Sequence, residues 1–472
     1  MLDHDRILSA DACLAIAKRI FGFARGTGET VVRMHSWWNG ELRWARNRVS
    51  LASDRRDIRI EIFRDVGVGR GNVDTNQTDD VSLEAAVRAA ERSARLSGFI
   101  RRPPPTGPPF PAQDRPATAI WSDATYGMTA ESRGEVARAI IAPAEQKSMQ
   151  SAGYMEMRAG SMTTISSARL AGTPAPWDVP FVSWTQAQCS MTVRDHEGTG
   201  SGWAGSSSHD WERIDATTLA AQALQRCLDS QHPVVLEPGR YTVILAPQAV
   251  ADLWEIVVSQ MFRETPEQGH GPWVLGQDDA LGIWRTKLGL KVIDPRITIS
   301  HDPTDPELGI IPEPWMEPVT WFQTGALTAL AYDRAYALGK LNRNASRRTM
   351  VGYRMSGGDT SIEDMIKSTQ RGLLVSRFSN IRLLDDQSLL CTGLTRDGLW
   401  LIEHGAITKA VKNLRFTESP LFALGSVEQL GVPMRVFRPV KNPYESTSPL
   451  TPAIVPALKV RDFSFTSTID AI

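Results

Sequence analysis

Hydrophobic residues recur at two spacings along the chain, and together these spacings predict a mixture of helices and strands. Apolar positions in Ser82–Ser97 follow a helical repeat, whereas Asp57–Phe63 alternates polar and apolar residues, as a half-buried strand does. The same criteria predict further helices at 9–23, 130–147 and 215–230, and strand-rich segments at 30–46 and 154–203. The pattern therefore predicts an α+β fold with antiparallel strands.

Pairs of residues that favour positive φ mark the expected turns between strands. Each pair combines Asn, Thr, Asp or His with Gly, a combination typical of tight hairpins. The predicted turns are Asn39-Gly40, Thr324-Gly325, Asp397-Gly398 and His404-Gly405. Thr360 and Glu363 have the spacing of a capping box and predict a helix start.

A segment rich in Pro and Gly, Gln231–Gly239, divides the pattern into two parts. We expect a first domain at 1–232 that mixes helices with antiparallel strands. We expect a second domain at 233–472 that is mainly antiparallel β. The segment Arg101–Asp114 holds six prolines and predicts a stiff connecting loop.

The second part opens with a strand that leads directly into a helix. Tyr241–Leu245 is rich in branched and aromatic residues, and Pro247 suits the first turn of the helix that follows. Its apolar positions have the spacing of one buried face: Val250, Leu253, Trp254, Val257, Val258 and Met261. Polar residues occupy the other side: Asp252, Glu255 and Ser259.

Composition excludes several classes of protein. The 472 residues include 52 basic and 53 acidic side chains, so the net charge of −1 gives no general attraction to nucleic acid or to an anionic membrane. The four cysteines form no C-x-x-C pair and fit reduced, buried thiols. The start lacks the features of a secretory signal, and no stretch approaches the ~20 apolar residues of a membrane span. A cytoplasmic location is therefore expected.

Local motifs give little evidence of catalysis. Ser206–Ser208, His209 and Asp210 contain the residue types of a serine hydrolase triad, but they are consecutive, whereas a triad converges from separate elements. His301-Asp302 is interpreted as a surface pair. Cys391 is a lone thiol in a predicted strand.

A glycine-rich stretch at Gly67, Gly69 and Gly71 could suggest a phosphate-binding loop. No helix is expected after it, as such a loop would require, so a strand–turn–strand hairpin is the preferred interpretation.

Several long segments resemble the TldD/PmbA family of metallopeptidases. In the second half these are residues 350–378, 392–424 and 455–467, and in the first half residues 41–50 and 69–96 carry a weaker form of the pattern. The resemblance implies the same two-domain α+β organisation. Within the family, TldD-type chains bind zinc, whereas PmbA-type chains, also called TldE, lack the zinc motif and assemble with a TldD-type partner.

The resemblance also places a zinc motif on the helix after Pro247. TldD-type chains carry H-E-x-x-x-H there, and the matching residues of this chain are Trp254, Glu255 and Ser259. The third ligand of TldD-type chains is a Cys near the C-terminus, whereas the last Cys here is Cys391. An indole offers zinc no lone pair. The resemblance therefore implies no metal and no cofactor in this chain.

Two interpretations of the residues at the motif positions stay open. Glu255 could be a surviving general base, but an ordinary polar residue of the helix is favoured, since there is no acidified water for it to act on. Trp254 could pack in the core, which is the default for an apolar position, or could block the space of the metal.

We therefore expect a PmbA/TldE-like, non-catalytic subunit that pairs with a zinc-bearing TldD-type sister chain to degrade or process unfolded peptides. The alternative is a stand-alone protein of the same fold that captures extended peptides on exposed strand edges. A self-sufficient hydrolase with another centre is a third, less favoured, hypothesis. No nucleic acid or membrane partner is expected.

Overall fold

A computed structural model describes residues 6–97, 120–173, 178–278, 280–310, 316–343, 348–438 and 451–469. It contains helices and mostly antiparallel strands, which confirms the α+β prediction. The predicted loop at Arg101–Asp114 lies outside the described residues. No helix in the described ranges is long and apolar enough to cross a membrane.

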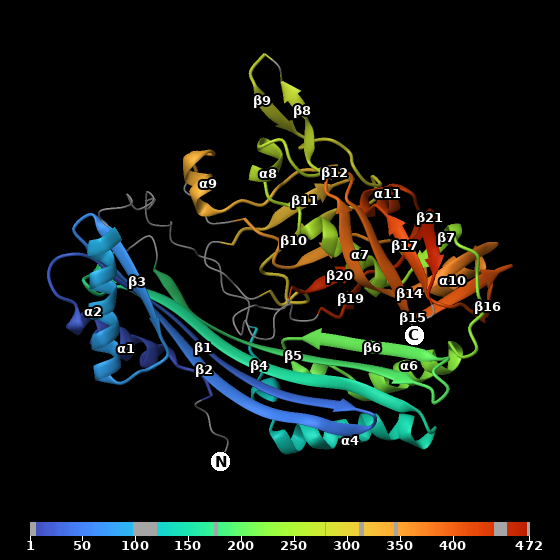
Figure 1. The fold of residues 1–472 in the computed structure, drawn as a ribbon, viewed down its shortest axis with the longest axis horizontal. Coiled ribbons are helices and arrows are strands. Elements are labelled where there is room, and N and C mark those ends of the chain that lie inside the picture. Colours follow the sequence, from blue (N-terminus) through green and yellow to red (C-terminus); the bar gives the residue numbers. More distant parts are fainter. Residues whose placement is uncertain are drawn as a thin grey trace.

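The first half is a six-stranded antiparallel sheet in the order β3-β2-β1-β4-β5-β6. The strands are β1 (Thr30–Ala45), β2 (Arg48–Val66), β3 (Gly69–Thr75), β4 (Gln150–Ser166), β5 (Val179–Arg194) and β6 (Ser201–Ser208). One face packs on helices, of which the longest are α1 (Ala10–Phe23), α2 (Asp80–Ser97), α4 (Ala130–Gln146) and α6 (Ala216–Asp229). The second half of the chain lies over the opposite face (Figure 1).

The second half contains two larger sheets. One has the order β14-β7-β21-β17-β15-β16, and β14 also pairs with β15, so the pairings close into a circuit. Its strands are β7 (Gly239–Leu245), β14 (Arg371–Asp385), β15 (Leu390–Glu403), β16 (Ala406–Ala410), β17 (Leu414–Glu418) and β21 (Leu458–Thr468), with β18 (Val427–Leu430) added on β21.

The other large sheet has the order β12-β11-β10-β13-β20-β19. Its strands are β10 (Ile299–His301), β11 (Val319–Gln323), β12 (Ala326–Leu327), β13 (Tyr353–Met355), β19 (Met434–Val436) and β20 (Ala453–Val455). A separate hairpin of β8 (Val274–Asp278) and β9 (Ile283–Thr286) projects from the body of this half (Figure 1). The remaining helices are α3 (Asp123–Tyr126), α5 (Ser167–Leu170), α7 (Pro247–Val258), α8 (Glu264–Glu267), α9 (Arg334–Gly339), α10 (Ile362–Lys367) and α11 (Pro420–Gly425).

The two halves meet along β6. The indole of Trp203 lies between the guanidinium of Arg377, 4.3 Å from the ring centre, and the ring of Phe437, whose centroid is 5.6 Å away. Ser201 Oγ donates a 2.7 Å hydrogen bond to Asp397 Oδ1. The sheet of the first half is built from residues before Gln231, and the sheets of the second half from residues that begin at Gly239. The domain boundary at residue 232 stays a prediction.

Two of the predicted turns are wrong. Asn39-Gly40 lies inside β1, where Gly40 pairs with Asp54. The glycine is needed there because a side chain would meet the Arg133 guanidinium and the Trp38 ring. The chain turns instead at Arg46-Asn47, both of which have positive φ. Asp397-Gly398 lies inside β15, where the pairing with β14 shifts register and forms a bulge.

The other turns are confirmed. Thr324-Gly325 joins β11 to β12, His404-Gly405 joins β15 to β16, and Gly67 lies in the hairpin turn between β2 and β3. The capping box at α10 is displaced by one residue. Ser361, not Thr360, is the N-cap, and its hydroxyl donates to Asp364 Oδ2 while it accepts from the Asp364 N–H.

Close approach of α6 to β6 requires a glycine at position 202. A Cβ there would lie 2.2 Å from the Ala223 carbonyl oxygen and 2.3 Å from the Cys227 nitrogen, both backbone atoms that cannot move alone. We expect Gly202→Ala to destabilise the protein by about 2 kcal/mol and to lower the thermal midpoint by several degrees. Gly134→Ala in α4, where a Cβ meets nothing within 4 Å, is the control. It should raise the midpoint slightly. Equal midpoints for both variants would contradict the packing argument.

Candidate functional site

The helix that follows β7 forms as the sequence predicts. Ala246 is extended, Pro247 occupies the first turn, and the helix runs to Val258 with its apolar side buried. It ends earlier than the apolar spacing predicts, because Ser259 is the C-cap. Helix α7 lies within the largest apolar cluster of the second half, beside Trp273, Trp321 and Phe322.

Trp254, at the first motif position, belongs to the core. Its side chain is fully buried, and its ring packs edge-on against Phe322 with centroids 5.3 Å apart. Phe322 contacts Trp273 in the same way. The indole Nε1 has no hydrogen-bond partner among the described residues, although a buried N–H normally has one. The geometry supports core packing for Trp254.

Ser259, at the last motif position, does not face the same space as Trp254. It is exposed, and its hydroxyl donates a 2.8 Å hydrogen bond back to the Ile256 carbonyl oxygen. This bond closes the last turn of α7. The helix therefore directs its first and last motif residues to different environments.

Glu255 forms an ion pair with Arg438, which lies two residues past β19. The Glu255 side chain is 24% exposed and the Arg438 side chain only 8%. Arg438 Nη1 also donates to the Ala251 carbonyl oxygen at 3.4 Å, and its backbone N–H donates to Ser207 Oγ at 3.4 Å. Glu255 is thus connected through one arginine to strand β6 of the first half.

Two further polar side chains complete what we term the α7 polar cluster: Asp252, Glu255, Tyr353 and Arg438. Asp252 accepts hydrogen bonds from Gln248 Nε2 at 2.8 Å and from the Phe378 N–H at 3.0 Å. Tyr353 is completely buried, and its hydroxyl has no partner among the described residues.

Burial dominates the titration of this cluster. It raises the pKa of Asp252, and it raises the pKa of Tyr353 with a further contribution from the carboxylates of Glu255 and Asp252. Burial alone would lower the pKa of Arg438, but Tyr353, Glu255 and Asp252 outweigh it and keep the pKa above its usual value. The guanidinium is therefore a permanent cation beside Glu255.

The residues at the motif positions do not fit a zinc ion. Zinc requires nitrogen, sulfur or oxygen donors around one point. Here the first position is an indole in the core, the last is an exposed cap, and a guanidinium contacts the glutamate between them. No group of three or more His, Cys, Asp or Glu in the described ranges is placed to hold a metal ion.

Cys391 does not supply a replacement ligand. It is buried in β15, its thiol donates to the Glu418 carbonyl oxygen at 3.2 Å, and burial raises its pKa to about 12. A protonated thiol is neither a nucleophile nor a metal ligand at neutral pH.

A row of polar side chains crosses the sheet face opposite the helices and ends at the α7 polar cluster. Directly paired residues form the row: Glu41 in β1, Glu156 in β4, Gln188 in β5 and Ser207 in β6. Ser207 is the residue whose hydroxyl contacts Arg438. The row thus joins the sheet to the helix that carries Glu255.

The carboxylate of Glu156 orients two amides in this row. Asn39 Nδ2 donates to it at 2.8 Å, Gln188 Nε2 donates to it as well, and Arg158 lies 3.2 Å away. The two amide nitrogens therefore point at Glu156. Asn39 Oδ1 and Gln188 Oε1 are buried and have no donor among the described residues.

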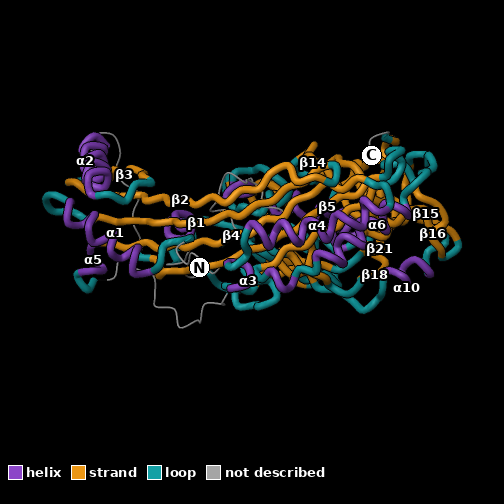
Figure 2. Tube along the Cα trace, turned by 90° about the horizontal axis from the view of Figure 1, so that it is seen from below, coloured by secondary structure: helices purple, strands orange, loops and turns teal. Residues whose placement is uncertain are grey.

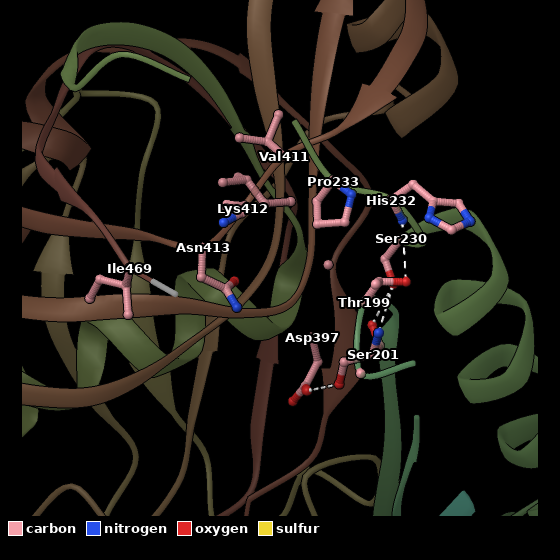
Figure 3. A pocket seen from close by; sticks show the side chains of 13 residues that line it. Thr199, Ser201, Ser230, His232, Pro233, Asp397, Val411, Lys412, Asn413 and Ile469 are labelled. Atoms are coloured by element: carbon pink, nitrogen blue, oxygen red, sulfur yellow. Dashed lines mark hydrogen bonds between the residues drawn. The ribbon is translucent and has the colours of Figure 1, made fainter. Parts of the chain in front are cut away.

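A pocket of about 350 Å³ lies where the two halves meet (Figure 3). Its polar wall includes Ser201, Ser230 and Asp397, and its apolar wall includes Val411 and Ile469. These residues come from segments far apart in the sequence, so local patterns could not identify the pocket.

The candidate serine triad does not assemble. Asp210 Oδ1 accepts from Ser122 Oγ at 2.7 Å, and Ser207 holds Arg438 and, through its carbonyl oxygen, Arg435. Burial and neighbouring arginines lower the pKa of His209. The loop serves the contact between the two halves.

The prediction that His301 is a surface residue is wrong. Its side chain is 2% exposed in β10, and its Nε2 lies 3.1 Å from the Glu317 carbonyl oxygen. The apolar residues around it, such as Trp321, are supplied by strand pairing that the local sequence does not reveal.

Comparison with known proteins gives one matching family and several solved structures of the same fold. Residues 238–467 match the family described as PmbA/TldA metallopeptidase C-terminal domain. None of the curated proteins matches the chain. Solved structures similar to it include a candidate modulator of a DNA gyrase from Thermotoga maritima, with 13% identity, a TM-score of 0.75, and coverage of 96% of this chain and 100% of that one.

Two more structures have the same arrangement. TldE from Thermococcus kodakarensis has 15% identity and a TM-score of 0.73, with 96% of this chain and 100% of that chain covered. A candidate modulator of DNA gyrase from Bacteroides thetaiotaomicron has 15% identity and a TM-score of 0.73, with coverage of 97% and 99%. At this identity the structures show a common fold.

Because Glu255 and Arg438 form an ion pair, we expect the effects of substituting them on the free energy of unfolding to be strongly coupled. Arg438→Met leaves a partly buried carboxylate without its cation and should cost about 3 kcal/mol of unfolding free energy. Adding Glu255→Gln should recover much of that loss, because no charge is then left unpaired. Urea unfolding of the two single variants and the double variant measures the coupling. Simple additivity would contradict a direct ion pair.

Burial of neutral His301 predicts a loss of stability in acid. Burial lowers the pKa of His301 from 6.5 to about 4, so the unfolded chain takes up a proton at higher pH than the folded chain. The contribution of neutral His301 to the free energy of unfolding is complete above pH 6.5. It is lost as the pH falls towards 4, by about 3 kcal/mol in total. Urea midpoints at pH 7.5 and pH 5 should therefore converge in His301→Gln. His232→Gln, at an exposed site, should leave the wild-type difference unchanged.

Proposed function

Because this chain belongs to the TldD/PmbA family, we propose that it is a TldE-like, non-catalytic subunit of a TldD-type metalloprotease. It pairs with a zinc-bearing sister chain, and the two together process unfolded peptides. The Glu255–Arg438 ion pair is the observation that carries the proposal. A general base must reach a water that a metal has acidified, whereas this carboxylate is held by a guanidinium at the contact between two halves of the chain.

In this proposal the two chains enclose a chamber for the peptide, and the sister chain binds the zinc ion. The chain itself holds no metal or other cofactor.

We also place the protein in the cytoplasm. All four cysteines are buried and unpaired, as expected for a protein in a reducing compartment.

A stand-alone peptide-binding protein is the second candidate. It is favoured by the long edge of β2, along which Arg48–Arg59 pairs with β1 on one side only among the described strands. Such an edge can capture an extended peptide by adding it as a strand. Peptide binding by the isolated chain, without a sister chain, would favour this candidate.

The proposal is tested by co-expressing the chain with a TldD-type chain from the same organism and measuring co-elution, zinc content and peptide cleavage. We expect one stable complex that contains zinc only in proportion to the TldD-type chain. Failure to co-elute, or stoichiometric zinc in the isolated chain, would overturn the proposal.

Glu255→Gln separates a structural role from a catalytic one in that complex. A structural Glu255 predicts cleavage within about twofold of the parent, whereas a general base would lose 10²–10⁴-fold. The glutamate of the zinc motif in the sister chain, changed in the same way, is the matched control and should abolish cleavage. A large loss with Glu255→Gln and an intact complex would show that this chain takes part in catalysis.

A further inference from the structure

We propose that the free edge of β2 between Arg48 and Arg59 is the surface on which an acidic, extended segment of the sister subunit adds as a further strand. This inference rests on the proposed function, because it requires a sister chain. The inference assigns the contact between the subunits to one strand of this chain and predicts an acidic partner segment.

The edge is long and unpaired on its outer side. Strand β1 pairs with β2 along its length, from Ala45 opposite Arg48 to Thr30 opposite Arg64. Strand β3 pairs only with Ile60–Val66, and no other strand of the described ranges pairs with β2. The twelve residues that remain span about 40 Å and present every second N–H and C=O outward. Figure 2 shows β2 along one margin of the sheet.

This part of β2 is also largely exposed, although Arg133 of α4 contacts it at Ser53 and Asp54. Ten of the twelve residues 48–59 are exposed, whereas from Ile60 onward alternate residues are buried under α1 and α2. Val49 and Leu51 are 52% and 36% exposed. A strand held by one neighbour and largely exposed gains little burial in the isolated chain. A partner that adds a strand would supply both hydrogen bonds and cover.

The charges along the edge select an acidic partner. Its basic residues are Arg48, Arg55, Arg56 and Arg59, with Arg46 in the adjoining turn, against Asp54 and Asp57. Arg59 is neutralised by Asp74 at 2.6 Å, and Asp54 is bound by Arg133. Arg46, Arg48 and Arg55 have no ion pair among the described residues. Opposite charges on paired strands stabilise by roughly 0.2–1 kcal/mol per pair.

The same arginines disfavour a second copy of this chain. Charged residues on an edge strand commonly prevent edge-to-edge association of identical molecules. Side chains stand perpendicular to the sheet and leave the in-plane backbone groups accessible. The arginines therefore repel an identical edge and still admit a strand of opposite charge.

The test compares two double variants of equal charge change in the complex with the sister chain. Arg48→Glu/Arg55→Glu reverses the edge, and Arg92→Glu/Arg138→Glu reverses two exposed arginines on α2 and α4. Circular dichroism and thermal midpoints establish that both variants fold. We expect the dissociation constant to rise at least tenfold in the edge variant and to stay within twofold in the control. Hydrogen exchange should slow at amides of residues 48–59 when the complex forms.

Each alternative result has a distinct meaning. A complex that forms while amides 48–59 exchange as fast as in the isolated chain overturns this inference and leaves the proposed function standing. Equal weakening by both double variants also overturns it, because long-range charge alone would then explain the effect. If the amides of residues 48–59 are protected from hydrogen exchange in a concentrated sample of this chain alone, the edge binds a second copy of the chain, and the inference is overturned. Absence of any complex overturns the proposed function and, with it, this inference.

Discussion

The structure depends on one arginine that joins the two halves of the chain. Arg438 contacts Glu255 and the Ala251 carbonyl oxygen of α7 on one side and Ser207 of β6 on the other. Its charge matters because the carboxylate of Glu255 is partly buried and a buried carboxylate is stabilised by a cation. Through this one side chain, helix α7 of the second half is held against strand β6 of the first half.

This arrangement explains why the residue at one motif position does not by itself reveal the role of that residue. Glu255 stands at a motif position, yet the side chain that contacts it is an arginine from the far end of the second half. Trp254 fills the core beside Phe322. The chemistry of such a helix is decided by residues that contact it from other parts of the chain.

Much of the fold followed from the sequence where periodicity was strong. The helix at Pro247 and the burial of Trp254 needed only the apolar spacing of α7. The position of Arg438 could not be predicted, because its contacts lie 183 residues away at Glu255 and 231 residues away at Ser207. Asn39-Gly40 misled for a related reason: the need for a glycine arises from the Arg133 and Trp38 side chains, not from a turn.

The pairing of β21 between β7 and β17 has a consequence for synthesis in the cell. Val243 pairs with Val460, so the strand that opens the second half lies beside one made more than two hundred residues later. Contacts of such long separation form slowly. Until Leu458–Thr468 has left the ribosome, β7 lacks this neighbour, and the backbone groups on that side of β7 stay unpaired. The main sheet of the second half can therefore be completed only after Leu458–Thr468 has been made.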